Sequence, residues 1–505
     1  MYYSVISGAI WGMRPYILNV EADVCNGMPF FNMVGLLSSE VKEARERVRS
    51  AIRNSGFELR AQRITINLSP ADKRKAGVLF DLPIAVAIMA ATDVINPSRL
   101  ADTIIVGELS LDGSIHKVNG VLPILIEAVS GGVKHCIIPY DNYNEATEAG
   151  NIHIIPVSNL KECVEYINSG TEYNYNNYGD ENIRDTTVED FSEVKGHNLI
   201  RRAAEIAVAG RHNMLMIGPP GAGKSMIAKR IAGIMPDLSK AEKMEIARIY
   251  SICGQLDGSV DKIKRPYRAP HHTITVQAMA GGGRYPAPGE LTMAHKGVLF
   301  LDELPEFNPL VIDSLRQPME EGTITISRAT GSYEFAADTM VVAAMNPCKC
   351  GYYPDRSRCS CSEEEVKRYI KRISGAILDR MDICVEVPAV TYNELIECKE
   401  GESSKDIKQR VTNAADIQKE RYKHEEFNDN AAITSKKIPV YCGLDNESRD
   451  IMKTAFEKFR FSTRNYYKVL RIARTIADLD GSESVKQEHL IEALGLSTVC
   501  KKYWE

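Results

Sequence analysis

The middle of the chain contains the stretch Gly218-Pro219-Pro220-Gly221-Ala222-Gly223-Lys224-Ser225. It follows an apolar run, Met214–Ile217, that is typical of a buried strand, and a helix-forming run begins at Met226. A glycine-rich turn before a helix is the alternative, but strand, loop and helix together indicate a phosphate-binding loop. In such a loop Lys224 reaches the β and γ phosphates and the Ser225 hydroxyl holds Mg²⁺. We therefore predict that residues 218–226 bind a nucleoside triphosphate.

A second motif, Gly297-Val298-Leu299-Phe300-Leu301-Asp302-Glu303, places two carboxylates directly after another apolar run. Acidic residues after a strand are common, but a phosphate loop earlier in the chain favours a functional role. Asp302 would then hold Mg²⁺ through water, and Glu303 would orient or deprotonate the attacking water.

A third predicted strand, 341–345, ends at Asn346. This amide would hydrogen-bond both the γ-phosphate and the attacking water, although a turn residue before Pro347 is the alternative. Arg380 and Arg464 follow later in the chain. Taken alone, both arginines would be interpreted as ordinary surface residues.

Composition sets broad limits on this chain. Its 505 residues predict two to four domains at roughly 150 residues each. A net charge of −5 argues against a uniformly basic nucleic-acid-binding protein but allows a local basic surface. The first residues lack the pattern of a signal peptide, and no apolar stretch approaches the ~18 residues that span a bilayer. We expect a cytoplasmic α/β multidomain protein with no membrane partner.

The order of strand and helix patterns divides the chain. Residues 1–167 mix both, with a half-buried strand expected at 63–68 and a charged helix at Ser39–Asn54. A polar stretch at 168–189 is the predicted linker. Residues 190–390 alternate apolar strands with helices, which predicts a parallel αβα sheet. Residues 391–505 show only helical patterns, so we expect a helical C-terminal domain.

Four of the twelve cysteines, Cys348, Cys350, Cys359 and Cys361, lie in the loop 346–362. Four thiolates satisfy tetrahedral Zn²⁺ with no open position, which predicts a structural zinc site. The alternative is four free thiols, as expected for the other eight cysteines in a reducing compartment. Lys349, Arg356 and Arg358 beside two tyrosines would suit nucleic acid. A solvated basic loop is an equal alternative.

Taken in order, these motifs resemble an AAA+ ATPase, and more narrowly the ComM/YifB family of the magnesium-chelatase-like branch. The most specific stretches are Arg265-Pro266-Tyr267-Arg268-Ala269-Pro270-His271-His272-Thr273, Gly281-Gly282-Gly283, Pro288-Gly289-Glu290-Leu291, Leu301-Asp302-Glu303-Leu304-Pro305-Glu306-Phe307 and Asn346-Pro347-Cys348-Lys349-Cys350-Gly351-Tyr352. The resemblance covers nearly the whole chain. Lys349 stands where the family usually has a second proline.

The resemblance implies a role for each motif residue. Asn346 corresponds to sensor 1, Arg380 to an arginine finger that serves the ATP of the neighbouring subunit, and Arg464 to sensor 2. Arg471 is the second candidate for sensor 2. The resemblance also implies ATP and Mg²⁺ as ligands, a C-terminal helical lid, and a ring that is expected to be a homohexamer.

Two insertions are candidates for DNA contact. The first carries Lys262, Lys264, Arg265 and Arg268 before His271 and His272, and packing of the two histidines against the Gly-rich loop is an equal alternative for them. The second, 322–335, is predicted to form a β-hairpin with Arg328 near its turn. In the related AAA+ clade such insertions project into the channel of the ring, where cations would contact phosphates.

Residues 61–140 resemble the Lon-protease-like domain, an α+β fold of the ribosomal S5 domain 2 type. A Lon peptidase needs a serine and a lysine, but Leu79 and Leu122 stand at those places. Ser69 or Ser110 with Lys75 lie outside the matching motif. We therefore expect no protease activity. The domain would bind DNA or a partner, and residues 73–75 offer a basic turn.

The function implied is an ATP-driven ring motor on single-stranded or branched DNA, with branch migration or helicase activity in homologous recombination or natural transformation. The alternative is the ATPase subunit of a chelatase-like complex that remodels a protein partner. The fused Lon-like domain and the cysteine loop favour DNA, because the chelatase subunit carries neither. A nucleotide-switched scaffold is disfavoured by the intact Glu303, Asn346 and Arg380.

Overall fold

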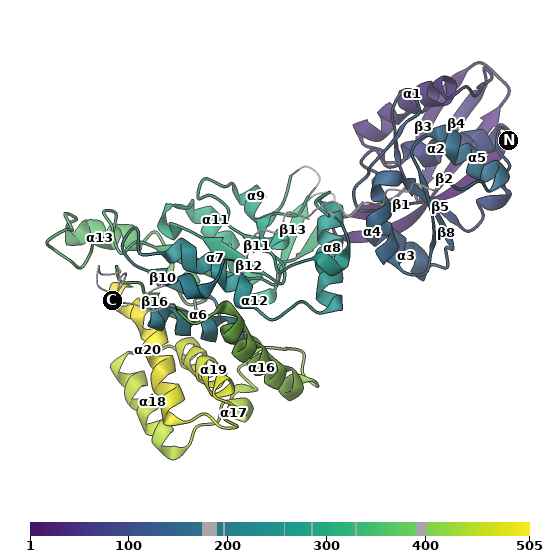
Figure 1. The fold of residues 1–505 in the computed structure, drawn as a ribbon. Coiled ribbons are helices and arrows are strands. Elements are labelled where there is room, and N and C mark those ends of the chain that lie inside the picture. The colour runs from purple at the N-terminus through teal and green to yellow at the C-terminus, as the bar shows by residue number, and fades with distance from the viewer. Residues whose placement is uncertain are drawn as a thin grey trace. The chain divides into compact units, whose positions relative to one another are not determined.

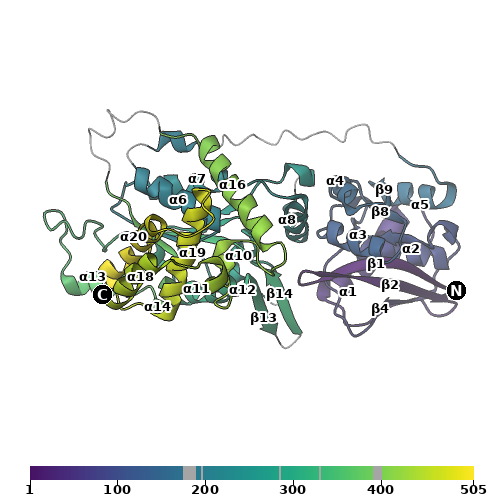
Figure 2. The same ribbon diagram turned by 90° about the horizontal axis from the view of Figure 1, so that it is seen from below.

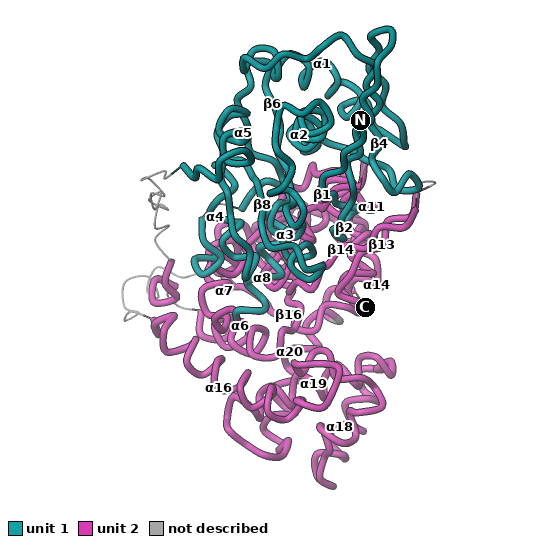
Figure 3. Tube along the Cα trace, turned by 90° about the vertical axis from the view of Figure 1, so that its right-hand side faces the viewer, with its two compact units in different colours: residues 1–185, 240–263 teal, residues 186–239, 264–505 magenta. Residues whose placement is uncertain are grey.

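The computed structural model describes residues 1–173, 189–194, 197–256, 258–283, 286–328, 331–389 and 401–504. The chain divides into two compact units, which Figure 3 shows in different colours. Unit 1 comprises Met1–Asp185 and Lys240–Ile263, and unit 2 comprises Thr186–Ser239 and Lys264–Glu505. Most of the predicted linker lies outside the described residues.

Unit 1 is built on a mixed seven-stranded sheet with the order β3-β4-β2-β1-β5-β8-β9. Its strands are β1 (Tyr2–Trp11), β2 (Arg14–Cys25), β3 (Phe30–Val34), β4 (Arg63–Ser69), β5 (Thr103–Ile105), β8 (His135–Pro139) and β9 (His153–Val157). The pairs β1–β2 and β2–β4 are antiparallel, and the other neighbours are parallel. A small antiparallel pair, β6 (Glu108–Leu109) and β7 (Ile115–His116), is separate. The strand expected at 63–68 is confirmed as β4.

Helices supply the other half of the core of unit 1. They are α1 (Ser39–Asn54), α2 (Asp81–Ala91), α3 (Val121–Ser130), α4 (Tyr143–Ala146), α5 (Leu160–Ser169) and α8 (Lys240–Ile252). The expected helix α1 is confirmed, and it buries Val41, Ala44, Val48 and Ala51, the spacing that places side chains on one helix face. Every residue of α2 is buried, which explains its continuous apolar sequence.

Helix α8 joins unit 1 although the sequence places it inside the predicted segment 190–390. Its Ala247 lies in the same apolar cluster as Leu122 and Leu125 of α3. The Ser251 hydroxyl donates to the buried Glu145 carboxylate at 2.6 Å. These contacts are long-range in sequence, so periodicity alone did not reveal them.

Unit 2 contains a five-stranded sheet with the order β11-β12-β15-β10-β16, and every pair is parallel. The strands are β10 (Met214–Ile217), β11 (Tyr267–Arg268), β12 (Val298–Leu301), β15 (Met340–Met345) and β16 (Ile383–Glu386). The predicted parallel sheet is confirmed. Because all strands run the same way, residues after β10, β12 and β15 share one edge of the sheet, the carboxyl edge.

Helices and one hairpin complete unit 2 (Figure 1). The helices are α6 (Asn198–Gly210), α7 (Lys224–Ile234), α9 (Val276–Ala280), α10 (Glu290–Met293), α11 (Pro309–Ser314), α12 (Arg316–Glu321), α13 (Glu363–Ile370), α14 (Gly375–Leu378), α16 (Ser404–Tyr422), α17 (Ile438–Tyr441), α18 (Asn446–Lys458), α19 (Thr463–Leu479) and α20 (Gln487–Trp504). The expected hairpin is confirmed as the antiparallel pair β13 (Thr323–Arg328) and β14 (Gly331–Ala336), a separate arm in Figure 2.

The C-terminal part of unit 2 is helical, as expected. Residues 401–504, all of which are described, contain helices and no strand. Buried residues of α16, α19 and α20, such as Val411, Ile472 and Leu490, belong to one apolar core with Met214 and Val342 of the sheet. The helical part therefore packs directly on the sheet part.

Candidate functional site

The phosphate loop connects β10 to α7 in a conformation that requires glycine. Gly221 and Gly223 have φ values of +77° and +83°, in the left-handed region. A Cβ atom on Gly218 would meet the backbone oxygen of Val387 at 2.1 Å. The glycines therefore let the loop turn tightly, so that the backbone N–H groups of the loop and of the first turn of α7 can point toward a phosphate.

Lys224 is the buried cation of this loop. Its Nζ atom donates to the backbone oxygens of Gly218 at 2.7 Å and Pro219 at 2.9 Å, and to Asn346 Oδ1 at 3.1 Å. Burial lowers the pKa of Lys224, while the nearby Asp302 and Glu303 carboxylates raise it. The ammonium group thus donates to neutral oxygens. A phosphate would replace them, because hydrogen bonds to a charged acceptor are stronger.

Ser225 and Asp302 lie together although 77 positions separate them in the sequence. The Ser225 hydroxyl donates to Asp302 Oδ2 at 2.6 Å, and the Glu303 amide donates to Oδ1 at 2.9 Å. A hydroxyl beside a carboxylate is a donor set that suits Mg²⁺. A cavity of about 380 Å³ is lined by Pro220, Gly221, Ala222, Gly223, Lys224, Ser225, Met226, Asp302, Glu303, Met345 and Asn346.

Glu303 has an unusual backbone conformation, with φ +52° and ψ +46°. For a residue other than glycine this costs on the order of 1–3 kcal/mol, and such positions cluster at functional sites. The strained turn directs the carboxylate toward His272, whose Nδ1 lies 3.4 Å from Glu303 Oε2. Sequence reasoning missed this contact. The position of His272 could have indicated it, because His272 follows β11, Glu303 follows β12, and these two strands are parallel neighbours.

The predicted arginines lie at the opposite edge of the sheet. Arg380 and Arg464 line a cavity of about 870 Å³. The same cavity is lined by residues that lie one or two positions before the strands β10, β12, β15 and β16, namely Asn213, Lys296, Thr339 and Asp382. We call this edge the amino edge. Neither arginine lines the phosphate-loop cavity. Instead Arg380 Nη2 lies 2.8 Å and Arg464 Nη2 lies 2.6 Å from the carboxylate of Glu320.

Arg471 differs from Arg464, the other candidate for sensor 2. Its Nε and Nη2 atoms both donate to the backbone oxygen of Ile433, at 2.9 and 2.6 Å. Burial lowers the pKa of Arg471. The Arg464 side chain is 43% exposed, and its Nη2 atom contacts the Glu320 carboxylate. Both arginines line the cavity at the amino edge, but Arg471 also connects elements of the helical part through Ile433.

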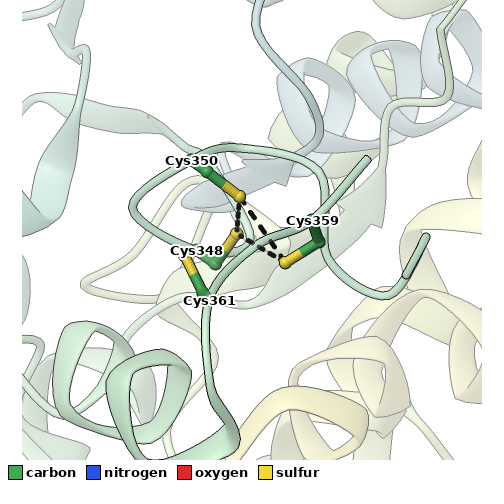
Figure 4. Close-up of side chains that lie close together, drawn as sticks. All are labelled: Cys348, Cys350, Cys359 and Cys361. Atoms are coloured by element: carbon green, nitrogen blue, oxygen red, sulfur yellow. Dashed lines mark hydrogen bonds between the residues drawn. The ribbon is translucent and has the colours of Figure 1, made fainter. Parts of the chain in front are cut away.

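The four cysteines of the loop between β15 and α13 converge on one point (Figure 4). Their sulfur atoms all lie within 4.8 Å of one another. The distances are 3.3 Å for Cys348–Cys350, 3.7 Å for Cys348–Cys359 and 3.5 Å for Cys350–Cys359. Tetrahedral zinc with bonds of ~2.3 Å needs sulfur atoms roughly 3.8 Å apart. The cluster therefore fits Zn²⁺ after a small expansion.

The cysteine loop also packs on the phosphate loop. Gly351 has a φ of +89°, and a Cβ atom there would meet Pro220 Cδ at 2.5 Å. Cys348 follows Asn346 by two residues and is fully buried. The loop that carries the cluster is therefore in direct contact with the phosphate loop.

Several predicted DNA-contacting cations are already engaged within unit 2. Arg268 forms two 2.6 Å hydrogen bonds with the Glu290 carboxylate, and Arg265 donates to backbone oxygens of Pro236 and Lys296. Arg358 stacks on the Tyr352 ring at 4.0 Å. Lys264 and Arg328 are exposed to solvent.

The lysine and serines considered for proteolysis in unit 1 have other contacts. Lys75 is fully buried and donates to the backbone oxygen of Pro70. Ser110 Oγ lies 2.7 Å from His116 Nε2. Leu122, at the place of the Lon lysine, is fully buried in the apolar core. Lys75 and Leu122 are thus buried, whereas Ser110 takes part in an exposed hydrogen bond.

None of the helices in the described part of the chain is both long and apolar enough to cross a membrane.

Comparison with known proteins identifies relatives along most of the chain. Residues 190–395 match the family described as magnesium chelatase, subunit ChlI, residues 20–142 match subunit ChlI of Mg-chelatase, and residues 401–497 match its C-terminal region. The chain is 38% identical over 499 residues to competence protein ComM of Haemophilus influenzae, covering 97% of this chain and 96% of the relative. It is also 38% identical to the protein YifB of Escherichia coli, with the same coverage. A Lon protease of Desulfovibrio desulfuricans is 26% identical over 30% of this chain and 19% of its own length.

Proposed function

The chain belongs to the ComM/YifB family of magnesium-chelatase-like proteins, and from that membership we propose that it is an ATP-hydrolysing AAA+ ring motor acting on DNA. Its finer activity would be branch migration or helicase action in homologous recombination or natural transformation. One observation carries the proposal: the nucleotide-site residues and the arginines lie at opposite edges of one sheet. Such an arrangement suits a site shared between subunits.

Hydrolysis would begin at the phosphate loop. Lys224 exchanges its backbone acceptors for the β and γ phosphates of ATP, and the loop amides bind the phosphate oxygens. Ser225 and Asp302 hold Mg²⁺, which neutralises charge on the phosphates when bound. Glu303 orients the attacking water and accepts its proton, and Asn346 hydrogen-bonds that water and the γ-phosphate.

The arginines would act on a neighbouring subunit. Arg380 and Arg464 are absent from the lining of the phosphate-loop cavity in their own chain. Placed at the amino edge, they would reach the ATP of the next subunit, as an arginine finger and sensor 2. Repetition of this heterologous contact closes a ring, for which we propose a homohexamer.

DNA is proposed as the substrate for two reasons. A relative that is 38% identical over 97% of this chain is named a competence protein. The hairpin β13–β14 is a separate arm with the exposed Arg328 near its end. Local cations of this kind would contact single-stranded or branched DNA despite the net charge of −5.

We also propose that the cysteine loop binds one structural Zn²⁺. Cys348, Cys350, Cys359 and Cys361 would provide four sulfur ligands and leave no open position. The metal would fix the loop that packs on Pro220 of the phosphate loop. In this role zinc stabilises the nucleotide site and takes no part in hydrolysis.

A second function is favoured by the descriptions of the matching families, which all name a magnesium chelatase subunit. The chain would then power the remodelling of a protein partner that inserts a metal ion. The nucleotide chemistry would be the same in both cases, so the partner decides between them.

The deciding experiment measures the ATPase rate of one preparation with and without forked or four-way DNA. We expect DNA to stimulate hydrolysis. Retained basal activity with no response to any DNA structure would support the chelatase-like function instead.

A further inference from the structure

Glu320 lies between the two arginines that we assign to the neighbouring subunit. Its Oε2 atom is 2.8 Å from Arg380 Nη2, and its Oε1 atom is 2.6 Å from Arg464 Nη2. Although desolvation raises it, the pKa of Glu320 lies below its usual range because both guanidinium groups donate hydrogen bonds to the carboxylate. One carboxylate thus binds two cations that come from separate parts of the chain.

The two arginines differ in how far an outside ligand could reach them. Arg380 Nη1 donates to the backbone oxygen of Ala376 at 2.6 Å, its Nε atom is buried without a hydrogen-bond partner among the described residues, and its side chain is 12% exposed, so a ligand would approach Nη2, the atom that contacts Glu320. The Arg464 side chain is 43% exposed. A phosphate has more oxygens and more charge than a carboxylate, and guanidinium groups bind it readily. A γ-phosphate would therefore compete with Glu320 for these donors.

Glu320 is also connected to the hairpin that we assign to DNA. It lies on α12, and Glu321 and Gly322 alone separate it from β13. The Gly322 amide donates to Pro318 of α12 at 3.0 Å, and the Ala337 amide after β14 donates to Gly322 at 2.8 Å. Ile324 and Phe335 at the base of the hairpin are buried. Because Gly322 joins both ends of the hairpin to α12, a force on the hairpin would be transmitted to α12.

We propose that Glu320 is a competing counter-ion that withholds Arg380 and Arg464 from the ATP of the neighbouring subunit until DNA displaces α12 through the hairpin β13–β14. The proposal rests on the proposed function. It assigns DNA stimulation of hydrolysis to the release of the two arginines. In the absence of DNA the arginines remain bound to Glu320 and the ring hydrolyses ATP slowly.

The first test is Glu320→Gln, which keeps the shape of the side chain and removes its charge. Hydrogen bonds to a charged partner are roughly twice as strong as neutral ones, so we expect the DNA-free kcat to rise on the order of fivefold. Stimulation by four-way DNA should fall to less than about half of the wild-type value. Glu321→Gln is the matched control, because Glu321 lies on the same helix and contacts Gln317 at 2.8 Å instead of an arginine. It should behave as the wild type.

The second test asks which subunit carries the effect. In a mixture of Lys224→Ala and Arg380→Ala subunits, the productive interface joins Lys224 of one subunit to Arg380 of the other. Glu320→Gln should raise the DNA-free rate when added to the Lys224→Ala subunit, which supplies the arginines. The same change in the Arg380→Ala subunit should have no effect. A general change in folding or ring stability would not depend on this placement.

A lower or unchanged DNA-free rate in Glu320→Gln, with ring formation intact by gel filtration, would overturn the proposal. An equal effect in both mixtures would overturn it as well. Failure of the proposed function looks different: the wild type would show no DNA stimulation, or the mixture of Lys224→Ala and Arg380→Ala would show no activity at all.

Discussion

Both edges of the five-stranded sheet in unit 2 carry cations and carboxylates, but these groups have different partners at the two edges. At the carboxyl edge, Lys224, Ser225, Asp302 and Asn346 hydrogen-bond to one another or to the loop that carries them. At the amino edge, two arginines share one carboxylate. The polar groups of the carboxyl edge bond to one another and to their own loop, whereas the cations of the amino edge share one carboxylate from a separate helix.

This difference explains how a single chain would bind ATP and yet hydrolyse it poorly. The carboxyl edge contains the residues that we propose for ATP binding and water activation, but none of the described arginines lines its cavity. The amino edge contains the cations that would stabilise charge in the transition state. Each edge is then useful only when it faces the other edge of a second copy.

The strongest test of this comparison is Arg380→Ala. A finger supplied in trans is worth ~10³ to 10⁵ in rate, so kcat measured with DNA, which would release the arginines from Glu320, should fall by about that factor while ATP still binds. Steady-state hydrolysis and binding of a fluorescent ATP analogue measure the two effects. Lys371→Ala is the control, because Lys371 is an exposed cation in the segment that precedes Arg380, and this variant should retain the wild-type rate.

Mixing gives the outcome that would contradict a shared site. Arg380→Ala and Lys224→Ala subunits should each be inactive alone, and a mixture should recover hydrolysis. If the mixture stays inactive while rings form, the two edges do not meet between subunits.

The second test concerns the carboxyl edge alone. Glu303→Gln should lower kcat by about 10² to 10⁴, the usual contribution of a positioned acid or base, without weakening ATP binding. The control is Glu306→Gln, since Glu306 pairs with Arg372 outside the nucleotide cavity. Equal losses in both variants would show that the acidic turn matters for folding and not for chemistry.

Much of the carboxyl edge was predictable from the sequence, because it depends on local patterns and one rule. Apolar runs at Met214–Ile217, at Val298–Leu301 and before Asn346 predict strands. In a parallel sheet their ends must share an edge, so Lys224 and Asp302 were expected to lie together. The predicted parallel sheet is confirmed, whereas the roles of its residues stay predictions.

The amino edge was less predictable, because its contacts join elements far apart in the chain. Arg464 and Glu320 are 144 positions apart, and nothing in the sequence near either residue indicates the pairing. The contact of His272 with Glu303 and the packing of α8 in unit 1 were missed for the same reason. Charged surface helices carry no periodic signal for the partner that they meet.

A third prediction extends the carboxyl edge to the cysteine loop. Cys359→Ser should abolish stoichiometric zinc binding. It should also weaken binding of an ATP analogue about tenfold, or ~1.4 kcal/mol, because the loop that packs on Pro220 is no longer fixed by the metal. Metal analysis and fluorescence titration measure the two effects. Cys25→Ser is the control, since Cys25 is an exposed cysteine outside the cluster. Loss of zinc with unchanged nucleotide affinity would separate the cluster from the nucleotide site.

The smallest effect is expected from His272, which contacts Glu303 but does not line the phosphate-loop cavity. His272→Gln should lower kcat about threefold and leave KM for ATP unchanged, because it removes a group that orients Glu303 without touching ATP. His116→Gln is the control, since His116 belongs to unit 1 and its Nε2 atom lies 2.7 Å from Ser110 Oγ. A change in KM alone would place His272 in nucleotide binding. A decrease in kcat with unchanged KM would mean that the carboxyl edge also depends on the segment after β11, the strand next to β12, which Glu303 follows.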